Sequence, residues 1–425
     1  MQPLKWLFPG MLVKRWVFLG VIGIIMISMG FAIIISEDIP ASKTGASVVI
    51  MIGIIIVITS VKRMIKSLLT VFMPQQKEKN LVNLVYKKRQ LERNYSIVAL
   101  GGGTGLSTLL HGLKEYTSNI AAIVTVADDG GSSGRLREEF GMLPPGDIRN
   151  CLVALADAEP LMGKLFQFRF KQGGGLKDHN FGNLFITAML KVTGDFEKAV
   201  KESSKVLAIR GSVIPSTLSK VVLEAEYTDG RRAIGESKIP HASTPIKRLY
   251  IKPAEARATR DAIEAIRKAD IILLGPGSLY TSIMPNLLIS DIYREVAASK
   301  AIKVYICNVM TQNGETDGYK ASDHLKAIIA HTNPDIATHC IVNTEKIPEE
   351  MLDRYSKERA YPVNPDVNMI EKMGYKVIVG NVINAANYVR HDSAKLARII
   401  NDMGSAKKRH NGRINGNREE DNNQK

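Results

Sequence analysis

The chain has 425 residues, 45% of them hydrophobic, and a formal net charge of +15, so it is long enough for two or three domains with a large core. The charge is concentrated towards the ends: residues 1–95 hold 13 Lys/Arg against 4 Asp/Glu, and residues 405–425 hold 6 against 3. The body between them is nearly neutral, which excludes the broad basic face of a nucleic-acid-binding domain.

Two apolar stretches, residues 16–35 and 45–61, predict a transmembrane hairpin over residues 1–62. A signal peptide is disfavoured because the first stretch exceeds a signal h-region and no small-residue cleavage site follows it. A buried core helix is the remaining alternative. By the positive-inside rule, flanking cations place both ends in the cytoplasm and the protein in the cell membrane. These cations are Lys14, Arg15, Lys62, Arg63 and Lys66.

Residues 63–95 form a basic juxtamembrane linker, which either rests on anionic lipid or is a solvated helical spacer. Residues 404–425 are rich in Asn, Gly and charge and predict a disordered polar tail. The three cysteines are widely spaced, which suits a reducing compartment and gives no metal-binding signature.

The body, residues 96–403, alternates apolar strands with helical patterns and predicts a Rossmann-like, doubly wound, mostly parallel sheet. The expected strands are at residues 96–100, 120–126, 270–274, 303–308, 336–343 and 375–383. The expected helices include residues 149–156, 195–208, 254–268 and 322–330, and a last helix from about residue 392. Residues 213–251 change character and predict a β-hairpin insertion, with its turn at residues 228–230.

A glycine-rich loop follows the first strand and opens a helical pattern, as in phosphate-binding loops. Its residues are Gly101, Gly102, Gly103, Thr104 and Gly105. The alternative is an ordinary turn, since glycine clusters also make turns. Leu106 stands where the dinucleotide fingerprint has its last glycine, which disfavours a nicotinamide enzyme.

The second strand ends in Asp128 and Asp129, which are candidate ligands for Mg²⁺ or for sugar hydroxyls. The next helical start carries anion-binding side chains, namely Ser132, Ser133 and Arg135.

Three further polar groups follow along the chain. The first is Asp147, Arg149 and Asn150, where Asp147 alternatively caps a helix with Arg149 as its partner. In the second, His179 is a general base, a phosphate ligand or a structural histidine, and Asn183 is a candidate ligand-binding residue. The third is a second glycine loop after a buried strand, with Gly275, Gly277 and Ser278. Walker, serine-hydrolase and zinc-hydrolase motifs are missing from the sequence.

Taken in order, these motifs resemble the gluconeogenesis-factor (YvcK-like) branch of the 2-phospho-L-lactate transferase (CofD-like) superfamily. The resemblance covers roughly residues 95–402. It is carried by residues 101–105, 128–135, 144–150, 179–183, 275–279 and 390–392. Typical members of the branch are soluble and begin near the first strand, whereas about 95 residues precede it here.

The resemblance implies a regulator that binds UDP-N-acetylglucosamine and supports cell shape and cell-wall synthesis during gluconeogenic growth. It implies that Arg390, and also Tyr355, contact the nucleotide sugar. Cell-wall synthesis proteins, a Ser/Thr kinase and membrane lipid are expected partners, nucleic acid is not, and a homodimer is compatible with this interpretation.

The transferase branch gives a second hypothesis from another class. It is a Mg²⁺-dependent enzyme that moves a phospho-group from a nucleotide-activated donor. Asp128 or Asp129 would then hold the metal, and His179 or Asp147 would serve as base. One pocket chemistry serves both hypotheses, so the preference for the regulator rests on the branch resemblance.

Overall fold

The computed structural model describes residues 14–35, 40–72, 89–157, 160–241, 244–384 and 389–422. Two compact units make up the chain, Met1–Arg89 and Gln90–Lys425.

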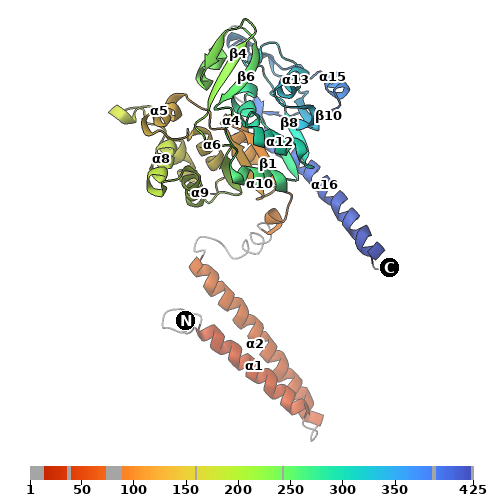
Figure 1. Cartoon of the computed structure of the whole chain (residues 1–425). Helices are drawn as coiled ribbons and strands as arrows, with labels where there is room; N and C mark the ends of the chain where they lie inside the picture. The colour runs from red at the N-terminus through yellow and green to blue at the C-terminus, as the bar shows by residue number, and fades with distance from the viewer. Residues whose placement is uncertain are drawn as a thin grey trace. The chain divides into compact units, whose positions relative to one another are not determined.

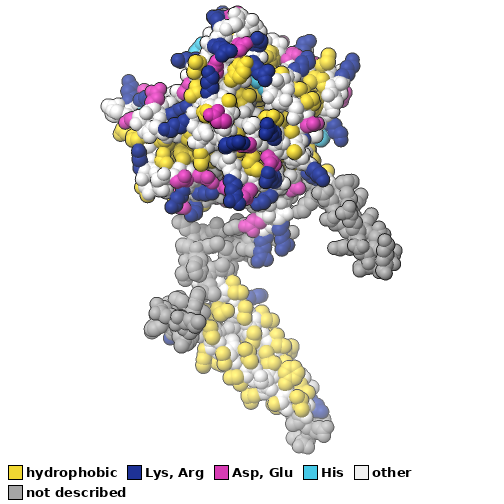
Figure 2. Space-filling model, in the orientation of Figure 1, with side chains coloured by type: hydrophobic (Ala, Val, Ile, Leu, Met, Phe, Trp, Pro, Cys, Tyr) yellow, Lys and Arg dark blue, Asp and Glu magenta, His cyan; other side chains and the backbone are white. Residues whose placement is uncertain are grey.

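The first unit is an antiparallel helical hairpin of α1, Lys14–Ile35, and α2, Pro40–Phe72. The helices approach closely because glycines face each other, and a Cβ on Gly23 would lie 2.9 Å from the Gly53 carbonyl oxygen. Both helices contain a segment long and apolar enough to cross a membrane: Lys14–Ile35, with a mean hydropathy of 2.7, and Lys43–Ser67 within α2, with 2.4. Their outward side chains are apolar (Figure 2).

Helix α2 is longer than the predicted span, because it continues past residue 61 to Phe72. The first part of the predicted linker is therefore helical. The linker cations Lys77, Lys79, Lys87 and Lys88 lie outside the described residues.

The second unit is built on one seven-stranded sheet, of which β1, β8 and β10 are labelled in Figure 1. Its strand order is β10-β9-β8-β7-β1-β2-β3, and every neighbouring pair is parallel. This confirms the predicted doubly wound α/β fold. The strands are β1 Ile97–Gly101, β2 Ile120–Val124, β3 Ser212–Pro215, β7 Ile271–Leu274, β8 Ile302–Ile306, β9 His339–Asn343 and β10 Lys376–Gly380. Central strands β1 and β7 are buried throughout, as expected for a sheet covered on both faces.

The strand order reverses between β1 and β7. From β1 the chain moves outward through β2 to β3, and it then returns to the other side of β1 with β7. Leu100 pairs with Leu274, so the two strands end at the same level. The loops that follow them therefore leave the same edge of the sheet at its switch point, where open α/β sheets bind ligands.

Helices connect the strands and cover the sheet. Helix α4 packs against α6 and α16, and α10 packs against α12. The helices of eight or more residues are α4 Gly103–Leu113, α5 Gly131–Phe140, α6 Gly146–Leu155, α7 Pro160–Gln167, α8 Phe181–Thr193, α9 Phe196–Val206, α10 Arg260–Lys268, α12 Ser290–Ala298, α13 Ala321–His331, α14 Glu349–Lys357 and α16 Ser393–Asn422. The shorter ones are α11 Met284–Leu287 and α15 Val367–Lys372. Helix α16 continues beyond residue 404, from which the sequence predicted a disordered tail.

The β-insertion is an antiparallel sheet of order β5-β4-β6. Its strands are β4 Val222–Tyr227, β5 Arg232–Ile234 and β6 Ile246–Lys252. The predicted hairpin is β4 and β5, and β6 adds a third strand. Residues 213–215, which the sequence assigned to the insertion, instead belong to β3 of the main sheet, because their side chains are buried beside β2.

Candidate functional site

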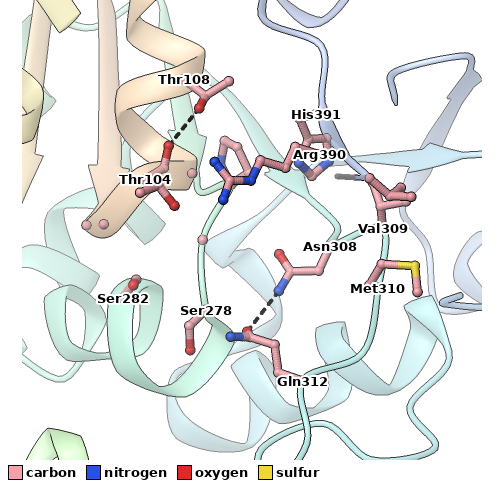
Figure 3. A pocket seen from close by; sticks show the side chains of 16 residues that line it. Thr104, Thr108, Ser278, Ser282, Asn308, Val309, Met310, Gln312, Arg390 and His391 are labelled. Carbon is pink, nitrogen blue, oxygen red and sulfur yellow. Dashed lines mark hydrogen bonds between the residues drawn. The ribbon is translucent and has the colours of Figure 1, made fainter. Parts of the chain in front are cut away.

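A pocket of about 360 Å³ opens at the switch point of the sheet (Figure 3). Its walls come from the segments that follow β1, β7 and β8 and from the short strand β12, Arg390–His391. The lining residues are Gly102, Gly103, Thr104, Gly105, Thr108, Pro276, Gly277, Ser278, Ser282, Asn308, Val309, Met310, Gln312, Val389, Arg390 and His391.

The first wall is the start of helix α4. Gly102 is the N-cap residue of α4 and, having no side chain, supplies no side-chain cap of its own. Gly103 has φ +62°, a conformation that favours glycine. The N–H groups that follow in this first turn and the positive end of the helix dipole together favour an anion such as a phosphate.

The two glycine loops lie against each other. A Cβ on Gly105 would be 2.6 Å from the Pro276 carbonyl oxygen and 3.0 Å from the Gly277 Cα. The loop after β7 can therefore reach the start of α4 only because residue 105 has no side chain. This contact brings the two predicted loops into one pocket.

Ser278 is fixed by its neighbours. Its Oγ donates a hydrogen bond to Glu315 and accepts one of 3.2 Å from the Thr281 N–H. Glu315 is buried, and this burial raises the pKa of its carboxyl. The sequence did not single out Glu315.

The Arg-His-Asp motif places one cation in the pocket. Arg390 reaches from β12 towards Thr104 at the start of α4 (Figure 3). His391 Nε2 lies 3.1 Å from the Cys307 carbonyl oxygen, and burial lowers the pKa of this histidine to about 4, so it is neutral at pH 7. Asp392 Oδ1 accepts hydrogen bonds from the N–H groups of Ala394 and Lys395 at the start of α16. The flanking residues thus anchor the strand that carries Arg390.

Tyr355 does not line the pocket but supports it. The Val389 N–H donates a 2.9 Å hydrogen bond to the Tyr355 hydroxyl, which in turn lies 3.3 Å from the Val389 carbonyl oxygen. Val389 precedes Arg390 and itself lines the pocket. The tyrosine that the resemblance assigned to ligand contact is therefore placed one layer behind it.

Most of the remaining predicted residues form what we call the polar cluster, on the other side of the first glycine loop. Its members are Asp128, Ser132, Ser133, Arg135, Asp147, Arg149, Asn150, His179 and Asn183. Asp147 connects the two regions: it accepts a hydrogen bond from the Gly103 N–H, and its Oδ2 would lie 2.4 Å from a Cβ on Gly102. Asp147 lies in the first turn of α6 but makes no cap of that helix, since the N-cap is Pro145. Gly101 and Gly275 end or follow their strands and do not line the pocket.

Three carboxyls, Asp128, Asp147 and Glu236, form what we call the acidic cluster. Burial, followed by the charge of Asp128, raises the pKa of Asp147 to about 6 and that of Glu236 to about 7. Burial also raises the pKa of Asp128, which accepts hydrogen bonds from Gly130 and Ser133. Glu236 comes from the insertion, in η4 (Glu236–His241), and the sequence did not identify it.

Asp129 binds the insertion. Its Oδ1 accepts a 2.8 Å hydrogen bond from the Ser237 N–H, and its Oδ2 lies against Gly235. Among the residues that the structure describes, no three His, Cys, Asp or Glu side chains are arranged to hold a metal ion. Mg²⁺ commonly takes only one or two carboxylates and completes its shell with water and substrate phosphates, so Asp128 and Asp129 fit only a site that a ligand completes.

Hydrogen bonds link most of the other predicted side chains. Ser132 Oγ lies 3.1 Å from His179 Nδ1 and accepts from Asn183 Nδ2 at 3.2 Å. Arg149 donates to Asn183 at 3.2 Å and to Asn150 at 2.6 Å. Burial lowers the pKa of His179, which keeps this ring neutral at pH 7.

Arg135 lies at the edge of the polar cluster and donates to the Lys177 carbonyl oxygen at 2.9 Å. Arg149 Nε is buried without a hydrogen-bond partner, and burial lowers the pKa of this guanidinium. The cluster therefore holds one cationic group with an unused donor beside the glycine loop.

The raised pKa of Asp147 predicts a pH dependence of stability. The folded chain keeps this proton up to about pH 6, whereas an ordinary Asp loses it near the reference value of 3.8. The folded state binds more protons in that window, so the free energy of unfolding falls as pH rises through it. We expect Asp147→Asn to gain thermal stability over the wild type as pH rises from 4 to above 6, measured as melting temperature against pH. Asp353→Asn, on the exposed surface of α14, is the control. A constant difference at all pH values would contradict the assignment.

The fold and this pocket define an α/β protein with a glycine-lined pocket at the switch point of a parallel sheet. The model of the family described as 2-phospho-L-lactate transferase CofD matches residues 97–383. The chain therefore belongs to the 2-phospho-L-lactate transferase CofD family.

Individual relatives agree with this assignment. A Bacillus subtilis protein named gluconeogenesis factor is 51% identical over 308 residues, which cover 72% of this chain and 97% of that protein. A relative from Nostoc sp. is 46% identical over 420 residues, covering 94% of this chain and 92% of its own, so the similarity includes most of the N-terminal region. A crystal structure of a Bacillus halodurans protein of the UPF0052 family is 48% identical with a TM-score of 0.70, covering 72% of this chain and 98% of that one.

Proposed function

We propose that this protein is a nucleotide-sugar sensor that binds UDP-N-acetylglucosamine and regulates cell-wall synthesis and cell shape during gluconeogenic growth. The observation that carries the proposal is the convergence of Arg390 and the glycine-rich start of α4 on one pocket. The names of the relatives support the gluconeogenic role.

The pocket chemistry suits a sugar diphosphate. The N–H groups of the first turn of α4 and the guanidinium of Arg390 neutralise a diphosphate from two sides. Hydroxyls and amides on the other walls suit the hydroxyl and amide groups of an N-acetyl sugar; they belong to Ser278, Ser282, Asn308 and Gln312. Among the described residues that line this pocket there is no Asp or Glu, so their charge favours a dianionic ligand.

A Mg²⁺-dependent transferase is the second candidate, and the acidic cluster is the observation that favours it. Asp147 lies directly behind Gly102 and has a pKa of about 6, a value suited to proton transfer near neutral pH. When bound, Mg²⁺ would neutralise phosphate charge, with Asp128 and Asp129 as its protein ligands. In this case His179, neutral and hydrogen-bonded to Ser132, is a further candidate base.

Calorimetry on the full chain in detergent micelles, with UDP-N-acetylglucosamine and with or without Mg²⁺, separates the two candidates. Binding with the sugar nucleotide recovered intact by chromatography supports the sensor. Consumption of the nucleotide, dependent on Mg²⁺, supports the transferase. If no uridine nucleotide binds, the sensor proposal is wrong.

We also propose that the helical hairpin anchors the protein in the cell membrane and leaves the nucleotide-binding unit in the cytoplasm. Both helices have the length and composition of membrane spans, and their outward side chains are apolar. This location would hold the sensor beside membrane-bound cell-wall synthesis proteins. A Ser/Thr kinase and a second copy of the chain are further proposed partners.

A substitution at Tyr355 can distinguish a residue that supports the pocket wall from one that contacts the ligand directly. Tyr355→Phe removes the hydroxyl that bonds to Val389, and we expect it to weaken nucleotide-sugar binding by about 1 kcal/mol, or roughly fivefold. Calorimetry measures the affinity, and circular dichroism checks that the fold is kept. Tyr361→Phe, at an exposed tyrosine outside the pocket, is the matched control. A loss of a hundredfold or more would contradict the supporting role and indicate direct contact.

A further inference from the structure

The positively charged side chains of the helical hairpin are concentrated at one of its ends. Within residues 14–35 and 43–67 the sequence contains no Asp or Glu, and its cations other than Lys43 meet at one end because α1 and α2 are antiparallel. These cations are Lys14, Arg15, Lys62, Arg63 and Lys66. Lys43 lies at the opposite end, and Glu37 and Asp38 precede it in the sequence. The two ends of the hairpin therefore differ sharply in charge.

At the basic end, two cations are held around one aromatic ring. The guanidinium carbons of Arg15 and Arg63 each lie 5.0 Å from the ring centroid of Trp16. Ser60 is buried, and its hydroxyl donates a hydrogen bond to the Trp16 carbonyl oxygen, which fixes the register of the two helices at this level. Arginines from both helices thus share a fixed position beside an indole ring.

This arrangement has the chemistry of a lipid headgroup site. Tryptophan favours the interface between hydrocarbon and water, which is the level of the phosphates. A guanidinium that contacts a ring keeps its in-plane N–H donors, and these match the oxygens of a phosphodiester. The described residues of the hairpin supply no carboxylate that could take the place of the phosphate.

We propose that Arg15, Trp16 and Arg63 form a binding site for the headgroup of an anionic phospholipid. The proposal rests on the membrane anchoring put forward above. It goes further, because it assigns a lipid class and the residues that select it.

The test uses Trp16 as its own probe. The chain has two tryptophans, so Trp6→Phe leaves Trp16 as the only one. The full chain is reconstituted in vesicles of equal amounts of phosphatidylcholine and phosphatidylglycerol, in which one lipid or the other carries brominated acyl chains. We expect brominated phosphatidylglycerol to quench Trp16 more strongly per mole than brominated phosphatidylcholine. Arg15→Gln combined with Arg63→Gln should abolish this preference, whereas Lys43→Gln should keep it.

The outcomes separate the two proposals. Equal quenching by both lipids, or a preference that survives the double arginine variant, overturns the headgroup site and leaves the anchor standing. Quenching by neither lipid overturns the anchor and the headgroup site together.

Discussion

Gly105→Ala is expected to lower both the stability of the nucleotide-binding unit and its affinity for the nucleotide sugar. Helix propensity alone would make alanine the better residue in the first turn of α4, by about 1 kcal/mol. The added Cβ, however, would lie 2.6 Å from the Pro276 carbonyl oxygen, and backbone atoms cannot yield as a flexible side chain can. Overpacking of this kind costs about 1–3 kcal/mol, so the clash wins.

The measurement is a melting curve with and without UDP-N-acetylglucosamine, together with calorimetry. We expect the melting temperature to fall by a few degrees and the affinity to fall about tenfold or more, because the two loops must separate. Gly163→Ala is the matched control: it lies within α7 with nothing within 4 Å of its Cβ, so the same substitution should stabilise the chain slightly. If both variants gain stability, the two loops do not pack as described.

The sequence predicted the sheet well because its strands are buried on both faces. Runs such as residues 270–274 are apolar without alternation, and glycine follows at their carboxyl ends. Strand β3 was the exception, because Ser212–Pro215 is only four residues long and ends in proline. Without its neighbour β2 in view, it could not be separated from the insertion that follows.

The predicted site residues lie in two separate places, the pocket and the polar cluster. Sequence patterns do not show this division, because it depends on which strands are neighbours in the folded sheet. Arg390 and the residues of both glycine loops meet in one pocket, because β1 and β7 are neighbours only in the folded sheet. Asp128 and His179 lie instead on the far side of Gly102, in the polar cluster. A motif list in chain order gives no information on which side of a glycine loop each group lies.

The residues that were missed came from segments with weak motifs. Asn308 and Gln312 line the pocket after β8, where the only sequence signal was a polar residue at the end of an apolar strand. Glu236 reaches the acidic cluster from the β-insertion, for which the sequence predicted a hairpin but no site residue. The positions of these residues in the pocket and in the acidic cluster depend on tertiary packing, which local periodicity does not encode.

Arg390→Ala is expected to weaken binding of UDP-N-acetylglucosamine by about 1.5–3 kcal/mol, or roughly 10- to 150-fold, the size of a lost charge-assisted hydrogen bond. Arg390 is an exposed side chain, so the loss should come with little change in melting temperature. Arg390→Lys keeps the charge but loses the planar guanidinium that can donate two hydrogen bonds to a diphosphate. Its affinity should therefore lie between those of the wild type and Arg390→Ala.

Arg398→Ala provides the control, because this arginine is also exposed but lies on α16 outside the pocket. Salt gives an independent readout: if Arg390 acts on a diphosphate, the wild-type affinity should fall more steeply with ionic strength than that of Arg390→Ala. If the affinity of Arg390→Ala is unchanged, Arg390 does not contact the ligand. The anion would then be held by the start of α4 alone, and Arg149, with its unused Nε donor in the polar cluster, would become the next arginine to test.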